Sequence, residues 1–160
     1  MSDAPTIDEP RKPGGGQDRP RVIAWPPYIY FVFFAAGLGL DYGWSSPFMA
    51  DTARYPMAGA LAVLSFQRFH GAGTNVQTWK LSTALVTEGP FRFSRNPIYL
   101  AFTLIYCGIS MAADSGWVLG LVVPVLAVMR YGVIAAEEPY LEAKFGEAFR
   151  HYKGHVRRWL

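Results

Sequence analysis

Two charged clusters stand beside long apolar runs in this sequence, and both contain residue types that bind small charged ligands. In the first, "EGPFRFSRNP", Arg92 and Arg95 precede an Asn-Pro pair, which favours the start of a helix. A helix capped by Asn96 presents free backbone N–H groups, and together with the arginines they suit an anionic group. The second cluster is the adjacent pair Glu137 and Glu138, which suits a cation. The spacing therefore predicts a site for charged groups of both signs.

The residues between the clusters form two apolar runs, so the chain is expected to cross a membrane and return. Both clusters then lie on one side, about one helix packing distance apart. A zwitterionic ligand would suit that gap. S-adenosylmethionine is such a ligand, with a carboxylate, an ammonium, a sulfonium and an adenine ring that needs an aromatic or apolar slot. The nearest aromatic residues are Phe91, Phe93 and Tyr99.

Membrane-spanning helices are the elements predicted to position these clusters. The 160 residues are 51% hydrophobic and only 17% charged, a balance typical of a membrane protein. Crossing a bilayer takes about 20 mainly apolar residues. The shortest apolar run, residues 55–67, reaches that length only if the flanking Arg54 and Arg68 extend to opposite interfaces. The predicted fold is an all-α membrane protein with four transmembrane helices in two hairpins, followed by a C-terminal amphipathic helix. The four runs are 22–40, 55–67, 96–113 and 115–129.

Basic residues predict the orientation of these helices. Lys and Arg gather before the first run, between the second and third, and after the fourth, whereas the opposite loops contain only Arg54. The positive-inside rule then gives a multi-pass membrane protein with both termini in the cytoplasm. The net charge of +3 is expected to anchor the protein to anionic lipid, so no nucleic-acid partner is predicted.

The predicted organisation is a disordered cytoplasmic tail, residues 1–21, and a single membrane domain, residues 22–160. The tail has four prolines, three consecutive glycines and little apolar surface to bury. The loop at 71–97 is long for a compact chain, and such loops are usually functional. The cofactor site is therefore expected within 71–160.

Pro139 is expected to start a new helix after the fourth span. Two acids at a helix C-terminus oppose the helix dipole, whereas the same acids at a helix N-terminus are favourable. Beyond Leu141, the residues Phe145, Phe149 and Tyr152 share one face, which predicts an amphipathic helix over the cytoplasmic surface.

Other reactive residues have simpler interpretations. Cys107 is alone, cannot form an intrachain disulfide and is expected to act as a small buried hydrophobe. His151 and His155 have helical spacing but lack a third ligand, so no metal is predicted. A soluble Rossmann-type methyltransferase is excluded by the length, the apolar runs and the missing dinucleotide fingerprint.

The segments "LVTEGPFRFSRNPIYLA" and "EEPYLEAKFGEAFRHYKGHVRRWL" resemble the isoprenylcysteine carboxyl methyltransferase and phospholipid methyltransferase group of integral membrane enzymes. The resemblance covers about residues 70 to 160 and implies that S-adenosyl-L-methionine binds between the cytoplasmic ends of the second hairpin, beneath the C-terminal segment. Gln77 matches a family glutamine only after the loop shifts by one residue. The cofactor contacts implied by the resemblance are Gln77, Thr83, Leu85, Val86, Phe91, Asn96, Pro97, Ile98, Tyr99 and Glu137.

Two departures from the family pattern affect the expected chemistry. Asn96 stands where the family usually has histidine in Arg-His-Pro-x-Tyr, and Thr83 replaces a second common histidine. Val133 stands where the carboxyl methyltransferases place a substrate arginine, and Arg130, about one turn away, is the nearest substitute for binding substrate. No general base is named, because methyl transfer to a carboxylate, thiolate or free amine depends on alignment and exclusion of water.

The resemblance thus predicts methyl transfer from S-adenosylmethionine to a lipophilic acceptor, of the isoprenylcysteine carboxyl O-methyltransferase type. One alternative is N-methylation of a phospholipid such as phosphatidylethanolamine. Another is a non-catalytic membrane protein that retains the cofactor pocket. Membrane lipid and a lipophilic methyl acceptor are the expected partners.

Overall fold

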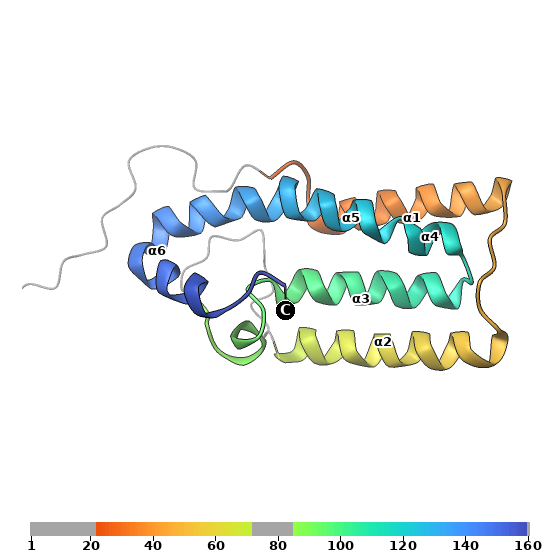
Figure 1. The fold of residues 1–160 in the computed structure, drawn as a ribbon, viewed down its shortest axis with the longest axis horizontal. Coiled ribbons are helices and arrows are strands. Elements are labelled where there is room, and N and C mark those ends of the chain that lie inside the picture. The colour runs from red at the N-terminus through yellow and green to blue at the C-terminus, as the bar shows by residue number, and fades with distance from the viewer. Residues whose placement is uncertain (1–21, 72–84, 160) are drawn as a thin grey trace, which may run out of the picture.

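The computed structural model describes residues 22–71 and 85–159, and all regular structure within them is helical. The predicted tail, Gln77 and Thr83 lie outside the described residues. In Figure 1 the helices run alongside one another, and the longest of them is made of successive segments. The elements are α1 (Pro26–Gly43), α2 (Asp51–Gly71), the 3-10 turn η1 (Gly89–Arg92), α3 (Pro97–Ala112), α4 (Gly116–Gly120), α5 (Val122–Val128), the π-helical turn η2 (Met129–Ile134) and α6 (Ala135–His155).

Length and hydropathy mark one helical stretch of the described residues, Gly116–His155, as able to cross a membrane. Its apolar part extends from Gly116 to Ala136 with Arg130 as the one charged residue. α3 is also apolar but shorter, at 16 residues. The all-helical class is confirmed, and the four-span topology stays a prediction.

The core lies where α1, α3 and the α4–α6 helix meet. Tyr30 of α1 donates a hydrogen bond to the Tyr99 carbonyl at 3.2 Å, and Tyr106 donates to the Val118 carbonyl at 2.8 Å. These bonds satisfy tyrosine hydroxyls that would otherwise be costly to bury. Helix α1 also packs closely on α4, because a Cβ at Gly37 would lie 2.8 Å from Val118. The core therefore fixes the position of α3 along its own axis relative to α1 and α4.

The end of the bundle opposite the charged clusters is closed by Asp114, which takes φ 52°. Its carboxylate accepts hydrogen bonds from the backbone N–H groups of Phe48 and Met49, at 3.0 and 2.9 Å. The Arg54 guanidinium lies 3.6 Å from the same carboxylate. Figure 1 shows the two connections, α1 to α2 and α3 to α4, at the same end of the bundle, and these hydrogen bonds tie them together.

The prediction that Pro139 begins a new helix is wrong. Pro139 lies inside α6, which continues from η2, and the chain breaks its helical geometry at Gly146 instead, with φ 54°. Glycine takes this left-handed conformation without steric cost. The acids do not need a new helix N-terminus because tertiary contacts, described below, compensate their charge. The predicted apolar face is also divided by this kink, with Phe149 and Tyr152 buried beyond it.

Candidate functional site

The N-terminus of α3 meets the first turn of α6, as the charge pattern predicts. The Tyr99 hydroxyl donates a hydrogen bond to the Glu137 carboxylate at 2.6 Å. One residue further on, a carboxylate oxygen of Glu138 lies 3.1 Å from the Arg95 guanidinium. The basic and acidic clusters lie far apart in the sequence but form one charged cluster at one end of the bundle, where Tyr99 bonds to Glu137, 38 residues away.

Arg158 is the third partner in this cluster. Its Nε and Nη2 donate to the two oxygens of Glu138 at 2.9 and 2.7 Å, the two-point geometry that arginine makes with a carboxylate. The backbone around it is also bound, since the Arg157 carbonyl accepts from the Arg95 N–H at 2.9 Å. Residues 156–159, called here the C-terminal segment, therefore lie across the start of α3, and Trp159 packs against the core.

Asn96 occupies the N-cap position before Pro97, but its predicted capping role is wrong. Its side chain makes no cap hydrogen bond. The amide Nδ2 donates instead to the Arg158 carbonyl at 3.0 Å, while the Asn96 N–H donates to the Ser94 hydroxyl at 3.1 Å. The C-terminal segment offers a carbonyl acceptor within reach, and the amide nitrogen uses it. Asn96 thus fastens the C-terminal segment to α3.

The two glutamates have opposite electrostatic environments. Burial raises the pKa of Glu137 to about 7, even though the Tyr99 hydrogen bond acts to lower it. Burial acts to raise the pKa of Glu138 too, but the hydrogen bond from Arg158 and the Arg95 charge outweigh it, and the pKa is lowered. Glu138 is therefore ionised and paired near neutral pH, whereas Glu137 keeps its proton to a higher pH than an ordinary carboxyl group.

The Arg95 guanidinium is nearly enclosed, with 11% of its side chain exposed. Its Nε has no hydrogen-bond partner among the described residues. A buried donor without an acceptor is costly, and because this nitrogen is itself buried, an anionic or carbonyl group of a ligand reaches it only when neighbouring side chains move.

The predicted cofactor contacts differ in accessibility. Pro97, Ile98 and Tyr99 are buried, and Val86 is 51% exposed. Partly buried positions are taken by Leu85, Phe91, Asn96 and Glu137. Glu137 and Tyr99 contact each other, and Asn96 is one turn from Tyr99 and bonded to the C-terminal segment.

The three aromatic residues predicted to form a slot for the adenine ring lie in different surroundings. Tyr99 belongs to the buried core, whereas Phe93 is 67% exposed. Phe91 lies in η1, where its carbonyl accepts a hydrogen bond from the Tyr152 hydroxyl at 2.7 Å. That bond attaches the second half of α6 to the loop before α3.

Val133, at the position where relatives of the carboxyl methyltransferase type place a substrate-binding arginine, and Arg130, its nearest substitute, lie in different surroundings. Val133 is completely buried in the core. Arg130 is exposed, and its guanidinium stands 5.6 Å from the centre of the Tyr131 ring. The Arg130 side chain is therefore exposed while position 133 lies in the core, and the predicted substrate-binding role of Arg130 stays a prediction.

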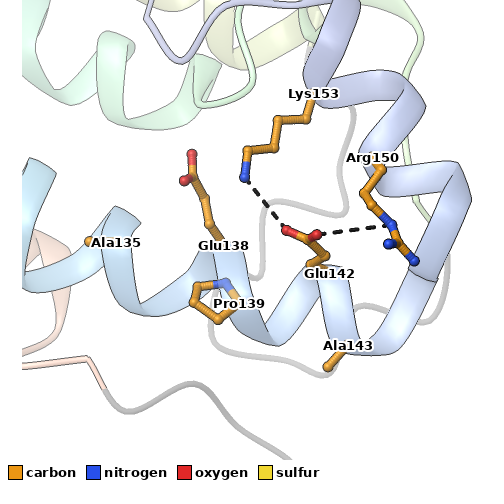
Figure 2. A pocket seen from close by; sticks show the side chains of 7 residues that line it. All are labelled: Ala135, Glu138, Pro139, Glu142, Ala143, Arg150 and Lys153. Atoms are coloured by element: carbon orange, nitrogen blue, oxygen red, sulfur yellow. Dashed lines mark hydrogen bonds and ion pairs between the residues drawn. The ribbon is translucent and has the colours of Figure 1, made fainter.

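An open cleft of about 470 Å³ lies next to Glu138 (Figure 2). This volume is within the range of small-ligand sites. Both arms of α6 contribute to it, because the kink at Gly146 folds the second arm beside the first. Its lining residues are Ala135, Glu138, Pro139, Glu142, Ala143, Arg150 and Lys153.

Comparison with known proteins identifies the family. The sequence model of the phospholipid methyltransferase family matches residues 53–148, more than half of the chain. The chain belongs to this family. An uncharacterized protein of Haemophilus influenzae is 48% identical over 63 residues, which are 39% of this chain and 89% of that protein. No solved structure matches the chain significantly.

Membership in the phospholipid methyltransferase family confirms the predicted resemblance and indicates a membrane methyltransferase. The match includes α3 and the first arm of α6 and ends just beyond the kink. Arg158 lies outside the matched residues, and none of the sequence patterns above assigns it a role. The signal that points to it is the run "RRWL", in which a basic pair adjoins an aromatic residue that can anchor it.

Proposed function

We propose that this protein transfers a methyl group from S-adenosylmethionine to a lipophilic acceptor at the cytoplasmic surface of a membrane. One observation carries the proposal: Tyr99 with Glu137, and Arg95 with Glu138, join the two family segments in one charged cluster. The cluster lies where the apolar part of the long helix ends, at Ala136. An acceptor dissolved in the bilayer would meet a polar cofactor at this boundary.

The residues present fit such a cofactor. The unpartnered Arg95 Nε and the uncapped N-terminus of α3 suit a carboxylate. Glu137 suits an ammonium group, since ionisation of this partly buried acid is favoured by a nearby cation. Leu85, Val86, Phe91 and the segment 96–99 remain proposed contacts by resemblance, as do Gln77 and Thr83 outside the described residues.

The bound cofactor would supply an electrophilic methyl group on its sulfonium. In this chain Arg95 and Glu137 would bind the amino-acid end of the cofactor. The hydrogen bond from Tyr99 would hold the Glu137 carboxylate in place for that contact, and the C-terminal segment would exclude water from the site. Such positioning supplies much of the rate of a transfer that requires an in-line approach. No residue is assigned as a general base.

For the acceptor, the phospholipid amine has better support than the prenylcysteine carboxylate. A carboxylate acceptor needs a cation near position 133, where the completely buried Val133 stands. Arg130 is exposed, with its guanidinium 5.6 Å from the centre of the Tyr131 ring, and we propose that it is not that cation. The family description likewise refers to phospholipid. The prenylcysteine acceptor and the non-catalytic alternative are retained as outcomes of the test.

The cofactor test is calorimetric titration of detergent-purified protein with S-adenosylmethionine. We expect micromolar binding that Glu137→Ala abolishes. Glu88→Ala, a change to an exposed acid of the preceding loop, is the matched control and should leave binding intact. Absence of binding to the folded wild-type protein would overturn the enzyme assignment.

The acceptor test supplies membranes with radiolabelled cofactor and separates phospholipids, prenyl thioethers and protein. Label in phospholipid would support the amine acceptor. Label restricted to prenyl thioethers would overturn it in favour of the carboxyl methyltransferase. Cofactor binding without transfer to any fraction would support the non-catalytic alternative.

A further inference from the structure

The α4–α6 helix contains a π-helical turn to which the proposed methyl transfer gives no role. In this turn, η2, the Ala135 N–H donates to the carbonyl of Arg130, five residues back in the chain. An α-helix closes the same bond over four residues, so a π turn holds one extra residue. Such turns are rare and are frequently found at functional sites. This one lies less than one helical turn before Glu137 and Glu138.

The extra residue decides which side chain faces α3 and the core. In an α-helix, residues about seven positions apart share a face, because they are separated by about two turns. Met129 is completely buried, so a regular helix would bring Ala136 to the core face and leave Glu137 about 100° away. With one residue more in the turn, Glu137 takes that place and reaches the buried Tyr99.

Glu138 depends on the same shift. Counted from Met129 at about 100° per residue, a regular helix would point Glu138 directly away from the core. The extra residue turns Glu138 back to the flank of the helix, where its carboxylate lies 3.1 Å from the Arg95 guanidinium. The shift also turns Ala135 and Pro139 outward, and both are exposed. Both acids therefore reach their partners because the helix holds the extra residue.

The segment before α1 contacts the π turn from outside the helix. The Ile23 N–H donates to the Gly132 carbonyl at 3.1 Å, which joins the start of the described chain to the long helix (Figure 1). Val22 and Ala24, on either side, pack against the core. The missing side chain at Gly132 makes room for the contact, since a Cβ there would lie 2.5 Å from Ile23 Cδ1 and 3.2 Å from Cγ1.

We infer that the π turn sets the direction of both acids, and that Ile23 and Gly132 are positioning residues that hold the turn through their backbone hydrogen bond. Helices rarely keep π geometry, so loss of this outside contact lets the extra residue move along the helix. The residues that it passes rotate by about 100°, and Glu137 leaves Tyr99. The inference rests on the proposed function for the role of Glu137 toward the cofactor, and it deepens that function by naming residues that act on the site through the helix.

The first test compares Ile23→Pro, which lacks the backbone donor, with Ile23→Ala, which keeps it. Detergent-purified full chain is titrated with S-adenosylmethionine by calorimetry. Ile23→Ala should bind like wild type. Ile23→Pro should bind about tenfold more weakly, the loss of one charge-assisted contact. The dependence of affinity on the ionisation of Glu137 should disappear in the same variant.

Deletion of Tyr131 should restore binding to Ile23→Pro. Tyr131 belongs to the π turn and is 73% exposed, so its removal takes out the extra residue and few packing contacts. The turn then becomes α-helical while Glu137 keeps its direction, and no outside hydrogen bond is needed to hold it. Deletion of Val123, 69% exposed in the regular helix α5, is the matched control and should not restore binding, because it rotates the acids.

A measurement without cofactor reports the direction of Glu137 itself. Thermal midpoints of Tyr99→Phe, Glu137→Gln and the double variant give the coupling between the two side chains. The coupling should be present in wild type and Ile23→Ala, absent in Ile23→Pro and present again after deletion of Tyr131. Should Ile23→Pro fail to fold, deletion of Tyr131 alone carries the test, and it should retain both the coupling and the affinity.

Equal coupling and equal affinity in Ile23→Pro and Ile23→Ala would overturn the inference. Loss of the coupling on deletion of Tyr131 from wild type would do the same, since the turn would then hold no extra residue. The expected pattern of couplings in a protein that does not bind S-adenosylmethionine would uphold the inference and overturn the proposed function. Cofactor binding by wild type with a coupling that no Ile23 variant changes would have the reverse meaning.

Discussion

Tyr99 and Glu137 are 38 residues apart in the chain, yet the tyrosine hydroxyl donates a 2.6 Å hydrogen bond to the glutamate carboxylate. Tyr99 is fixed by the core, because its carbonyl accepts from Tyr30 and its ring is buried. Because Tyr99 is fixed in this way, the bond holds the carboxylate of Glu137, the acid proposed to bind the cofactor, in a defined position. Glu137 is held in place before any ligand arrives.

Replacing Tyr99 by phenylalanine should weaken both the fold and cofactor binding. The change leaves a largely buried carboxylate without its donor, which costs about 1–3 kcal/mol of unfolding free energy. Because the lost hydrogen bond lowers the pKa of Glu137, that pKa should rise further in the variant. Thermal unfolding and calorimetric titration at pH 7 would measure the two effects.

Tyr42→Phe is the control for this variant, since Tyr42 is 97% exposed on α1. We expect no change in either measurement. If Tyr99→Phe bound the cofactor like wild type at every pH, the hydrogen bond would have no part in positioning Glu137.

Cofactor affinity should rise with pH between about 6 and 7.5. The folded pKa of Glu137 is raised to about 7 from 4.5, so without cofactor the acid loses its proton only near neutrality. An ammonium group binds the ionised form, and binding must therefore release a proton at lower pH. Calorimetry in buffers of different ionisation enthalpy would report that proton, and Glu137→Gln should remove both the pH dependence and the proton release.

Stability of the free protein should change in the opposite direction. A raised carboxyl pKa favours the protonated folded state, so this contribution is complete below pH 4.5 and is lost as the pH rises through about 7. Glu138, whose pKa is lowered, stabilises the fold above its unfolded pKa and loses that contribution as the pH falls. Comparing thermal midpoints of Glu137→Gln and wild type from pH 5 to 8 isolates the Glu137 contribution: the midpoint of the variant minus that of wild type should increase with rising pH, and a value that stays constant or decreases would contradict the assignment.

The pair of Arg158 and Glu138 should couple the C-terminal segment to the site. The two hydrogen bonds are short, and the side chains are 28% and 12% exposed, so their coupling should exceed that of a surface pair, at about 1–3 kcal/mol. A double-mutant cycle with Arg158→Gln and Glu138→Gln, followed by thermal unfolding, measures it. Arg157→Gln is the control because that side chain is exposed. Equal losses in the Arg157 and Arg158 variants would show that the pair contributes nothing specific.

The contact between α1 and α4 should not tolerate a larger residue at Gly37. A Cβ there would meet the Val118 backbone and side chain at 2.8 Å, whereas nothing lies within 4 Å of one at Gly39. Gly37→Ala should lower stability by about 1–3 kcal/mol through overpacking. Gly39→Ala should leave it unchanged or slightly raised. Thermal midpoints in one detergent compare the two, and equal midpoints would refute the close packing.

The sequence predicts the helices well, and it also predicts which end of the bundle holds the charged cluster. Apolar runs predict helices, and the observed α3, Pro97–Ala112, starts where Asn-Pro predicts and ends within a residue of the predicted 96–113. The observed α1 is displaced, at Pro26–Gly43 in place of 22–40, because the Pro-Pro pair favours a helix start at residue 26. Periodicity and local caps determine these features, so neighbouring residues are enough to predict them.

The direction of individual side chains depended on contacts that no local pattern encodes. Asn96 bonds to the Arg158 carbonyl and not to its own helix, and Pro139 stays within α6 while Gly146 turns the chain. The sequence by itself determined the helical class, the family and the meeting of a basic with an acidic segment. Only the tertiary structure decided that Glu138 is paired while Glu137 is bound to Tyr99. The physical reason is that burial and hydrogen bonding at each acid depend on residues brought from three distant parts of the chain.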